Sequence, residues 1–412
     1  MAAARGRDRG HGCAGVSVLV VGTGPVGLTA ALVLARDGVP VTVLEAGSGL
    51  STASRASTFH PATLDLLADL GVAQPFTALG RAVHSLQWRD RSGALIAEMP
   101  YSLLEGLTRH PFRLHAEQSA LTPLLLEELT RFPHVDVRFD TPVSGVVQQP
   151  DGVEVVLRTG GTLRAEHVLA ADGAHSAVRA SLGLRFAGAE YPTCALRVIT
   201  DTPLDELVPG LSPMTYFRHP EQSCSVLGMP GLWRVILRVP REAHDDTVPR
   251  DRVVDLLHRA LPTAAARIAI RDAHTYRTSR RVLDDYRVGR VLFAGDAAHL
   301  TSTAGGMNMN CGIHDAVDLA GALAAVSRGA SDDALDTAAR RRRTAVTDQV
   351  IPRSEARVSG VDGRGGARVE DAVREIAETA EDPVAATAWL SRASMLDSAP
   401  RHVPPARSVQ SA

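Results

Sequence analysis

The chain has 412 residues, of which 45% are hydrophobic and 22% charged, and its formal net charge is −2. This length suggests two or three domains with a sizeable buried core. The near-neutral charge argues against a nucleic-acid or anionic-membrane partner, which usually requires an excess of basic residues. The sequence contains no lysine, so all 44 basic residues are arginine, and chemistry that needs a lysine Schiff base or a phosphate-binding lysine is excluded.

The four cysteines, Cys13, Cys194, Cys224 and Cys311, form no CxxC pair and match no zinc-site spacing. We therefore expect free thiols in a reducing cytoplasm, with no metal site and no dithiol redox centre. No apolar run reaches the roughly 18 residues of a membrane helix. The segment before Val16 lacks the apolar stretch of a signal peptide and is predicted to be a disordered leader.

The first elements in chain order form a βαβ pattern. The apolar run Val16–Val21 predicts a buried parallel strand, and the apolar spacing of Leu28–Arg36 predicts a helix that ends at Asp37-Gly38. Val39–Glu45 predicts the second strand. Together they make a unit of about 30 residues, the size of a βαβ motif.

The glycine-rich stretch Gly22–Gly27 (GTGPVG) joins the first strand to the helix. Gly22 permits a tight turn, Gly24 lets a pyrophosphate approach the backbone, and Gly27 lets the helix pack closely on the strand. The start of the helix presents unpaired N–H groups to phosphates. Glu45 stands about 20 residues on, where a carboxylate accepts hydrogen bonds from ribose hydroxyls. The unit predicts dinucleotide binding; the alternative is a glycine-rich turn followed by a surface glutamate.

Short strands and helices alternate through the next part of the chain. Helices are predicted at Pro61–Leu70 and Glu117–Leu129, and a strand pair within Ser85–Met99 turns at Asp90–Gly93. Further strands are expected at Val135–Phe139, Val143–Gln148, Val153–Arg158, Thr162–Ala165 and Val168–Ala171.

The stretch from Phe186 to Asp285 alternates in polarity and is predicted to form a sheet-based second domain with one helix, Asp251–Ala260. The glycine-rich segment Gly360–Arg368 is expected to be a loop or hinge, and the last dozen residues are expected to fray. The remaining strands are expected at Ala195–Asp201, Met214–His219, Ser223–Met229, Trp233–Val239 and Val291–Phe293, and the remaining helices at Gly312–Val326 and Ala334–Arg343.

Three separated stretches resemble the FAD-dependent aromatic hydroxylases, the class A flavoprotein monooxygenases such as para-hydroxybenzoate hydroxylase. The first is GTGPVG with Glu45, and the second, Ala171–Arg179 (ADGAHSAVR), is similar to the DGxxSxxR motif of that family. The third begins at Gly295–His299 (GDAAH) and continues through Gly305-Gly306 and Met309-Asn310 to Asp315-Ala316. All three occur in the order that the family shows.

The resemblance implies an α/β fold, with a Rossmann-like FAD-binding domain of the glutathione reductase type and an inserted sheet-rich substrate domain. It also implies contacts to FAD: Asp296 to the ribityl chain, Arg55 to a phosphate, and Gln118 near a ribose. Asp172 and Arg179 correspond to a motif tied to both FAD and NAD(P)H. The full implied cofactor set is Gly22, Gly24, Pro25, Val26, Gly27, Glu45, Arg55, Gln118, Asp172, Gly295, Asp296, Gly306, Met309 and Asn310.

The family resemblance also predicts the domain boundaries and the reaction. The FAD-binding domain is expected at 16–80, 112–185 and 286–360, the substrate domain at 81–111 and 186–285, and a helical tail at 361–412. The implied activity is NAD(P)H- and O2-dependent hydroxylation of a small aromatic substrate, with NAD(P)H bound transiently because the sequence holds one dinucleotide fingerprint. The alternatives are a flavin oxidase, reductase or other tailoring enzyme on the same fold, or a non-catalytic FAD-binding protein. No matched motif supplies a catalytic acid or base.

Two positions depart from the family pattern. Thr303 stands where many members have proline, and Asn308 stands where glycine usually precedes Met-Asn. Both are expected in the loop around the flavin ring, with Asn308 in a left-handed conformation that asparagine tolerates. We therefore expect a looser loop, and expect Thr303→Pro with Asn308→Gly to raise flavin occupancy.

Several other residues have two interpretations. His60, His299 and His314 are expected to pack structurally rather than to catalyse. The arginine run Arg340–Arg343 is expected to be a solvated helix face. For the aromatic residues Trp88, Trp233 and Tyr216 the sequence leaves two roles open: packing in the core or lining a substrate pocket.

Overall fold

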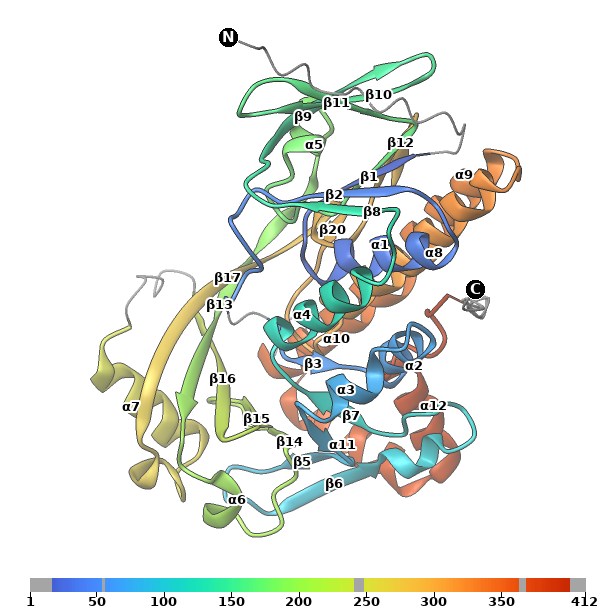
Figure 1. Cartoon of the computed structure of the whole chain (residues 1–412). Helices are drawn as coiled ribbons and strands as arrows, with labels where there is room; N and C mark the ends of the chain where they lie inside the picture. Colours follow the sequence, from blue (N-terminus) through green and yellow to red (C-terminus); the bar gives the residue numbers. More distant parts are fainter. Residues whose placement is uncertain (1–16, 54–55, 241–247, 363–367, 401–412) are drawn as a thin grey trace.

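The computed structural model describes residues 17–53, 56–240, 248–362 and 368–400. Two large sheets dominate the structure, and the long paired strands β13 (Ala187–Thr200) and β17 (Ile270–Val282) of the second sheet extend toward the first (Figure 1). The expected leader, Cys13, Arg55 and the last dozen residues lie outside the described residues.

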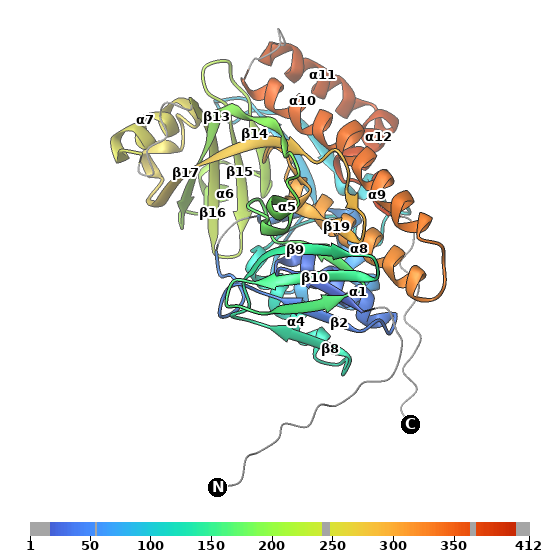
Figure 2. The same ribbon diagram turned by 90° about the horizontal axis from the view of Figure 1, so that it is seen from above.

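The first sheet has six strands, which are parallel except for the antiparallel pair β18–β19 at one edge. Its inner strands are almost entirely buried because both faces of the sheet are covered, whereas the two edge strands are only partly buried. Helices α1 (Pro25–Arg36), α4 (Gln118–Leu129) and α8 (Asn308–Ser327) pack on one face, and a small antiparallel sheet lies on the other (Figures 1 and 2). Across the large sheet the strands are β18 (Arg287–Val288), β19 (Val291–Phe293), β12 (His167–Ala170), β1 (Val18–Val21), β2 (Val41–Leu44) and β8 (Val135–Arg138); the small one holds β11 (Thr162–Ala165), β10 (Gly152–Leu157) and β9 (Val143–Gln149).

The second large sheet has eight strands and joins distant parts of the sequence. Strand β5 (Ser85–Arg89) pairs in parallel with β14 (Met214–Phe217), so two segments more than a hundred residues apart share one sheet. Helix α7 (Arg250–Ala260) packs on this sheet through Val253 and Leu257. In order, the strands are β20 (His299–Leu300), β17, β13, β16 (Leu232–Pro240), β15 (Cys224–Met229), β14, β5 and β6 (Leu95–Pro100).

A three-stranded sheet and several short helices complete the core. Strand β7 (Arg113–His115) lies between β3 (Thr58–Phe59) and β4 (Arg81–Val83). The helices are α2 (Pro61–Asp69), α3 (Ala73–Thr77), α5 (Ala177–Ser181), α6 (Leu204–Leu207) and the 3-10 turn η1 (Tyr101–Leu104).

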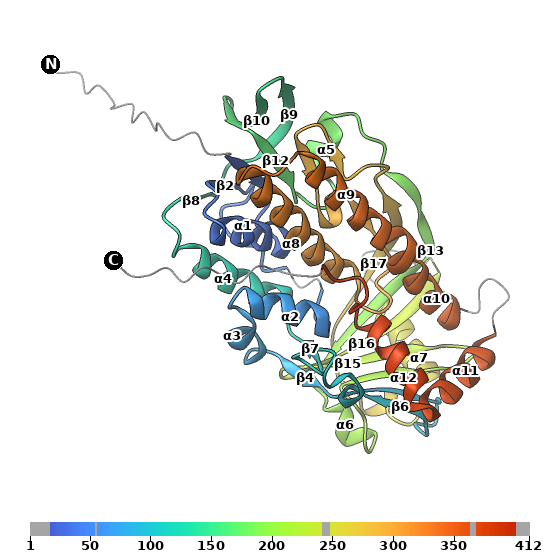
Figure 3. The same ribbon diagram turned by 90° about the vertical axis from the view of Figure 1, so that its right-hand side faces the viewer.

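The first of the C-terminal helices packs beside α8, and the last ones pack on the second sheet. Helix α9 (Asp333–Ala345) continues through a π-helical turn into α10 (Ile351–Asp362), and α11 (Val369–Glu381) and α12 (Pro383–Ala393) pack beside β5 and β6 (Figure 3). The ring centroids of Trp88 on β5 and Trp389 on α12 are 5.4 Å apart. The predicted helical tail is therefore part of the packed structure. No helix among the described residues is long and apolar enough to cross a membrane.

The α/β fold predicted from the sequence is confirmed, with three local differences. Strand β17 was not predicted, because its 13 residues carry four arginines and mostly half-buried side chains. Helix α8 begins at Asn308, four residues earlier than expected. Helix α10 runs through Gly360 to Asp362, so the predicted loop or hinge is wrong for these first residues, and residues 363–367 lie outside the described residues.

Candidate active site

A cavity of about 1590 Å³ lies between the two large sheets and the C-terminal helices. Gly27, Gly295 and Asn310, which were also predicted to contact cofactor, do not line it, and Arg55 lies outside the described residues. The predicted residues that do line it are Gly22, Gly24, Pro25, Val26, Glu45, Gln118, Asp172, Asp296, Gly306 and Met309.

The glycine motif places the start of α1 at the cavity wall. Gly22 has a φ of +108°, a conformation that side chains rarely adopt. A β-carbon added to Gly27 would lie 2.0 Å from the carbonyl oxygen of Gly22, so close packing requires glycine there. A β-carbon added to Gly24 would meet no atom within 4 Å, because Gly24 faces the cavity. The unpaired N–H groups of the first helical turn therefore border open space suited to an anion.

Glu45 is bound to the glycine motif from the end of β2. Its Oε2 accepts hydrogen bonds from the backbone N (2.9 Å) and Oγ1 (2.7 Å) of Thr23, and its Oε1 accepts from the N of Gly47 (2.9 Å). Burial raises the pKa of Glu45, but the hydrogen bonds from Gly47 and Thr23 outweigh it and the pKa is lowered. Glu45 is thus an ionised acceptor on the cavity wall that also braces the turn.

We expect Glu45→Ala to weaken cofactor binding by about 1.5–3 kcal/mol, the usual worth of hydrogen bonds to a charged group. Part of this loss should come from the freed Thr23, so Thr23→Ala should reproduce a fraction of it. Titration of the apo protein with FAD, followed by fluorescence quenching, measures both. If Glu45→Ala binds FAD as tightly as the wild type, the carboxylate only stabilises the glycine turn and does not bind the cofactor.

The second and third motifs are tied together by Arg179. Its Nη1 donates to the carbonyl of Ala297 (3.0 Å) and its Nη2 to that of Ala174 (2.6 Å). Asp172 accepts from the N of Val178 through Oδ2 (3.2 Å), but its buried Oδ1 has no hydrogen-bond partner among the described residues. Burial, the largest influence, raises the pKa of Asp172. Since Asp172 lines the cavity, this acceptor matches a hydroxyl or N–H donor of a bound molecule.

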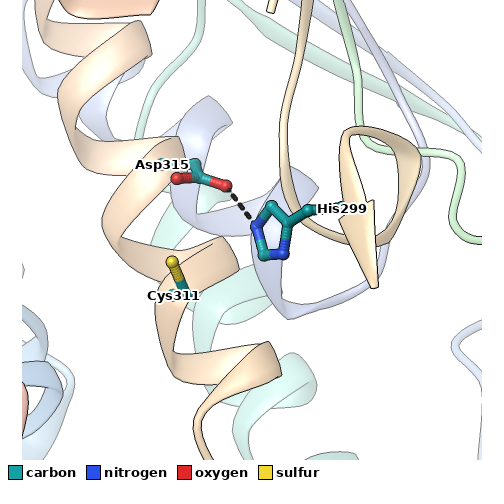
Figure 4. Close-up of side chains that lie close together, drawn as sticks. All are labelled: His299, Cys311 and Asp315. Atoms are coloured by element: carbon teal, nitrogen blue, oxygen red, sulfur yellow. Dashed lines mark hydrogen bonds and ion pairs between the residues drawn. The ribbon is translucent and has the colours of Figure 1, made fainter. Parts of the chain in front are cut away.

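A chain of polar contacts runs inward from Asp296. Its Oδ1 accepts a hydrogen bond from Nδ2 of Asn308 (2.7 Å). The Oδ1 of Asn308 faces the backbone N of Thr301 (3.1 Å) and Nδ1 of His299 (3.2 Å). Nε2 of His299 lies 2.8 Å from Oδ2 of Asp315 (Figure 4). Both imidazole nitrogens thus face acceptor oxygens, which only the protonated ring can satisfy.

The charge of His299 follows from the same geometry. Burial lowers the pKa of His299, but the Asp315 carboxylate raises it by a larger amount, so the net pKa lies well above 6.5. Arg342 donates from Nε to the other oxygen of Asp315 (2.9 Å). The prediction that His299 is structural agrees with this arrangement. The prediction that Arg340–Arg343 form a solvated helix face is wrong for Arg342, whose side chain is 1% exposed.

His299, Cys311 and Asp315 also lie close enough together to suggest a cation site (Figure 4). The position of Arg342 is unfavourable for a bound cation. Its Nη2 lies 3.4 Å from Sγ of Cys311, and its Nε already donates a hydrogen bond to Asp315. With His299 protonated, two positive charges already surround one carboxylate. We interpret the cluster as a buried ion-pair network.

The other predicted histidines and aromatic residues divide between core and cavity. Nε2 of His60 lies 2.9 Å from the carbonyl of Gly305, and Nε2 of His314 lies 3.0 Å from Oγ1 of Thr63, so both are packed. Trp88 and Tyr216 line the cavity, whereas Trp233 belongs to the core under the second sheet.

One expectation for the loop around Gly305 needs correction. Asn308 is the first residue of α8 and is not left-handed; the positive φ values fall on Gly305 (85°) and Gly306 (67°). The side chain of Asn310 is buried, and its Nδ2 donates to the carbonyls of Thr58 (2.8 Å) and Gly306 (2.7 Å). Thr303 is exposed on the cavity wall.

Asn308→Gly is therefore expected to lower flavin affinity rather than raise it. The change removes the hydrogen bonds that hold Asp296 and Thr301, and each is worth about 0.5–3 kcal/mol depending on charge. Flavin content after purification and an FAD titration measure the effect, with Thr303→Pro as the separate control. Higher flavin content in Asn308→Gly would restore the looser-loop interpretation.

The fold and the cavity define an α/β nucleotide-cofactor enzyme, and comparisons with known proteins specify the family. The sequence model described as "FAD binding domain" matches residues 15–354. Para-nitrophenol 4-monooxygenase from Pseudomonas sp. (strain WBC-3) is 35% identical over 349 residues, which cover 82% of this chain and 85% of that protein. 6-hydroxy-3-succinoylpyridine 3-monooxygenase HspB from Pseudomonas putida (strain DSM 28022 / S16) is 34% identical, covering 82% and 86%.

Solved structures give the same result. The crystal structure of p-nitrophenol 4-monooxygenase PnpA from Pseudomonas putida DLL-E4 superposes with a TM-score of 0.85 at 30% identity, covering 92% of this chain and 98% of that one. The chain belongs to the FAD-binding-domain family of aromatic monooxygenases and is an FAD-dependent oxidoreductase. The open space beside Gly24 and the Oδ1 of Asp172, which has no hydrogen-bond partner among the described residues, fit this cofactor.

Sequence reasoning missed three arginines that the structure places at or near the site. Arg113 and Arg357 line the cavity, and Arg342 anchors the buried network. Arg113 offered a weak signal, since it is a charged residue between the apolar residues Phe112 and Leu114. Arg357 offered none, because one arginine on an amphipathic helix is usually solvated.

Proposed function

We propose that this chain uses NAD(P)H and O2 to hydroxylate a small aromatic substrate. The supporting observation is the continuity of the cavity, which Gly24 and Glu45 line in one part and Trp88, Tyr216 and Trp389 line in another. A cofactor along the first part and an aromatic molecule in the second would share one space. The names of the relatives, which act on nitrophenol and on a hydroxypyridine, favour a substrate of this kind.

The cavity residues would divide the binding of FAD between them. The N-terminus of α1 beside Gly24 would hold the pyrophosphate, Glu45 a ribose, and Asp296 the ribityl chain. Residues near Met309, at the start of α8, would lie along the flavin ring. When bound, FAD supplies electron transfer between NAD(P)H and O2, and the chain binds, orients and shields the reactants.

The domain assignment remains part of this proposal. Segments 16–80, 112–185 and 286–360 would form the FAD-binding domain, and segments 81–111 and 186–285 the substrate domain. The tail from 361 would close the substrate part, since α12 contributes Trp389 to the cavity. No side chain on the wall is assigned as a catalytic acid or base.

Three measurements on purified protein test the proposal. A flavin absorbance spectrum reports cofactor content, anaerobic NADH and NADPH titrations report reduction, and turnover under ¹⁸O2 reports oxygen insertion. We expect label in the product when a phenol such as 4-nitrophenol is supplied. Peroxide without labelled product from any phenol would favour an oxidase, and flavin that neither nucleotide reduces would favour a non-catalytic protein.

A further inference from the structure

A buried pair of serines fixes one loop of the cavity wall from behind. This loop, residues 301–306 between β20 and α8, is called the cavity loop below, and all of its residues except Ser302 line the cavity. Oγ of Ser302 is in hydrogen-bond contact with Oγ of Ser354 on α10, and both side chains are 0% exposed. Oγ of Ser354 also donates to the carbonyl of Ser302 (3.3 Å). The cavity loop is thus joined to a helix that lies 52 residues further along the chain.

Ser302 also organises the cavity loop internally. Its Oγ accepts a hydrogen bond from the backbone N of Ala304 (3.2 Å), and its carbonyl accepts one from Oγ1 of Thr301 (3.1 Å). A serine hydroxyl has one donor and two acceptor sites, so Ser302 can bind Ala304 and Ser354 at the same time. The loop then runs through Gly305 and Gly306, whose backbones have positive φ values and little intrinsic restraint. Its conformation therefore depends on such contacts.

The hydroxyl of Ser354 is the polar group on an otherwise apolar face of α10. Ile351, Ser354 and Val358 follow the spacing of one helix face, and all three are buried. Burying a hydroxyl costs free energy unless it is hydrogen-bonded. Packing alone would be served by alanine at this position, so the contacts with Ser302 are what the hydroxyl adds.

Helix α10 is a firm support for the loop because it is anchored on its other side. Nη1 of Arg353 donates to Oδ1 of Asp397 (2.9 Å) and to the carbonyl of Arg392 (3.2 Å), at and beyond the end of α12. One turn after Ser354, Arg357 packs on the cavity loop, since a β-carbon added to Gly305 would lie 1.8 Å from its Nη1. The loop is therefore held against a helix that is itself fixed.

We infer that Ser354 is a positioning residue for the flavin: through Ser302 it holds the cavity loop in the conformation that receives the cofactor. Neither serine lines the cavity, so the effect is conformational rather than a direct contact. Without this pair the loop would sample other conformations, and part of the binding free energy of FAD would be spent on ordering it. This inference rests on the proposed function, in which the flavin ring lies beside this loop and the start of α8.

The first test is a double-mutant cycle on FAD affinity. Ser302→Ala and Ser354→Ala remove the same contact from opposite sides, and each should raise the Kd for FAD of the apo protein about 5- to 50-fold. The double variant should lose no more than the weaker-binding single variant, because the shared contact is removed only once. Losses that multiply in the double variant would show that the serines act independently and would overturn the inference. If one single variant does not fold, the other still measures the loss.

The second test follows the loop itself. Hydrogen exchange of the apo protein, measured by mass spectrometry on a peptide covering residues 301–306, should be about 10-fold faster in Ser354→Ala. Ser394→Ala is the matched control, because Ser394 at the end of α12 is also 0% exposed but its Oγ has no hydrogen-bond partner among the described residues. A lower melting temperature of Ser354→Ala with unchanged loop exchange, or an equal increase in Ser394→Ala, would assign Ser354 to general packing and reject the inference.

The outcome is separable from that of the proposed function. FAD affinity and loop exchange are measured without NAD(P)H, O2 or substrate, whereas the isotope experiment reports oxygen insertion. Weakened FAD binding in both serine variants without labelled product from the wild type would contradict the proposed function alone. Labelled product with unchanged FAD affinity in the variants would contradict the role of Ser354 alone.

Discussion

Replacing Arg342 with methionine is expected to lower the free energy of unfolding by about 3–5 kcal/mol, the usual cost of leaving a buried charge without its partner. Arg342 holds Asp315 through Nε at 2.9 Å and the carbonyl of Ser398 through Nη1 at 2.7 Å. The change would leave Asp315 with His299 as its only charged partner among the described residues, and would free the segment after α12. Urea unfolding of the apo protein measures the loss.

Arg341→Met is the matched control on the same helix. Arg341 pairs with Asp318 through Nε at 2.8 Å, but its side chain is 55% exposed. Solvent screens such a pair, and its removal should cost no more than about 1 kcal/mol. Equal losses in the two variants would contradict the buried-network interpretation.

The His299–Asp315 pair also makes stability depend on pH. The pKa of folded His299 is raised above 6.5, so its contribution is full below that value and is lost as pH rises through the folded pKa. Burial raises the pKa of Asp315, but His299 and Arg342 lower it below 3.8 on balance. The contribution of Asp315 is present above 3.8 and is lost as pH falls through the folded pKa. His299→Gln should flatten the alkaline loss.

The second large effect is expected at Gly24. Gly24→Val should leave the fold intact but abolish flavin binding, because the added side chain would stand in the cavity at the start of α1. Losing the helix-terminus contacts to a diphosphate, together with the steric block, should weaken binding at least about 100-fold. Flavin absorbance per protein and the melting temperature of the apo protein measure the two effects separately.

Two other glycines serve as controls for this variant. A β-carbon added to Gly321, on α8, would meet no atom outside its own helix turn within 4 Å, and Gly321 does not line the cavity, so Gly321→Val should leave the flavin content unchanged. Gly27→Ala should instead destabilise the fold, since its β-carbon would lie 2.0 Å from the oxygen of Gly22. Retained flavin in Gly24→Val would reject the proposed position of the diphosphate.

Local sequence was sufficient for the elements whose physics is local. The βαβ unit at residues 18–44 was predictable because buried parallel strands are short and β-branched, and because glycine alone permits its turn. The DGxxSxxR and GDAAH stretches were identified instead by their resemblance to the family, although part of the first also acts locally in the structure. Ser176, for example, accepts from the N of Arg179 at 3.0 Å.

Sequence patterns failed where a side chain acts across a large separation. Asn308 was interpreted as a turn residue, but its conformation is helical and its amide joins Asp296 to His299. Strand β17 lacked a clear apolar alternation because its stability comes from pairing with β13. In both cases the partners are set by the tertiary arrangement rather than by neighbours in the sequence.

The sequence by itself therefore determined the family, the cofactor class and most of the first sheet. Only the tertiary structure decided which arginines are buried and which of them pair with a carboxylate. Arg341 and Arg342 are adjacent and chemically identical, yet the helix turns one toward solvent and the other toward Asp315. Burial multiplies the strength of a charge interaction and the cost of leaving it unmet. That is why Arg342 is part of the buried network and Arg341 is not, and why no sequence pattern distinguished the two.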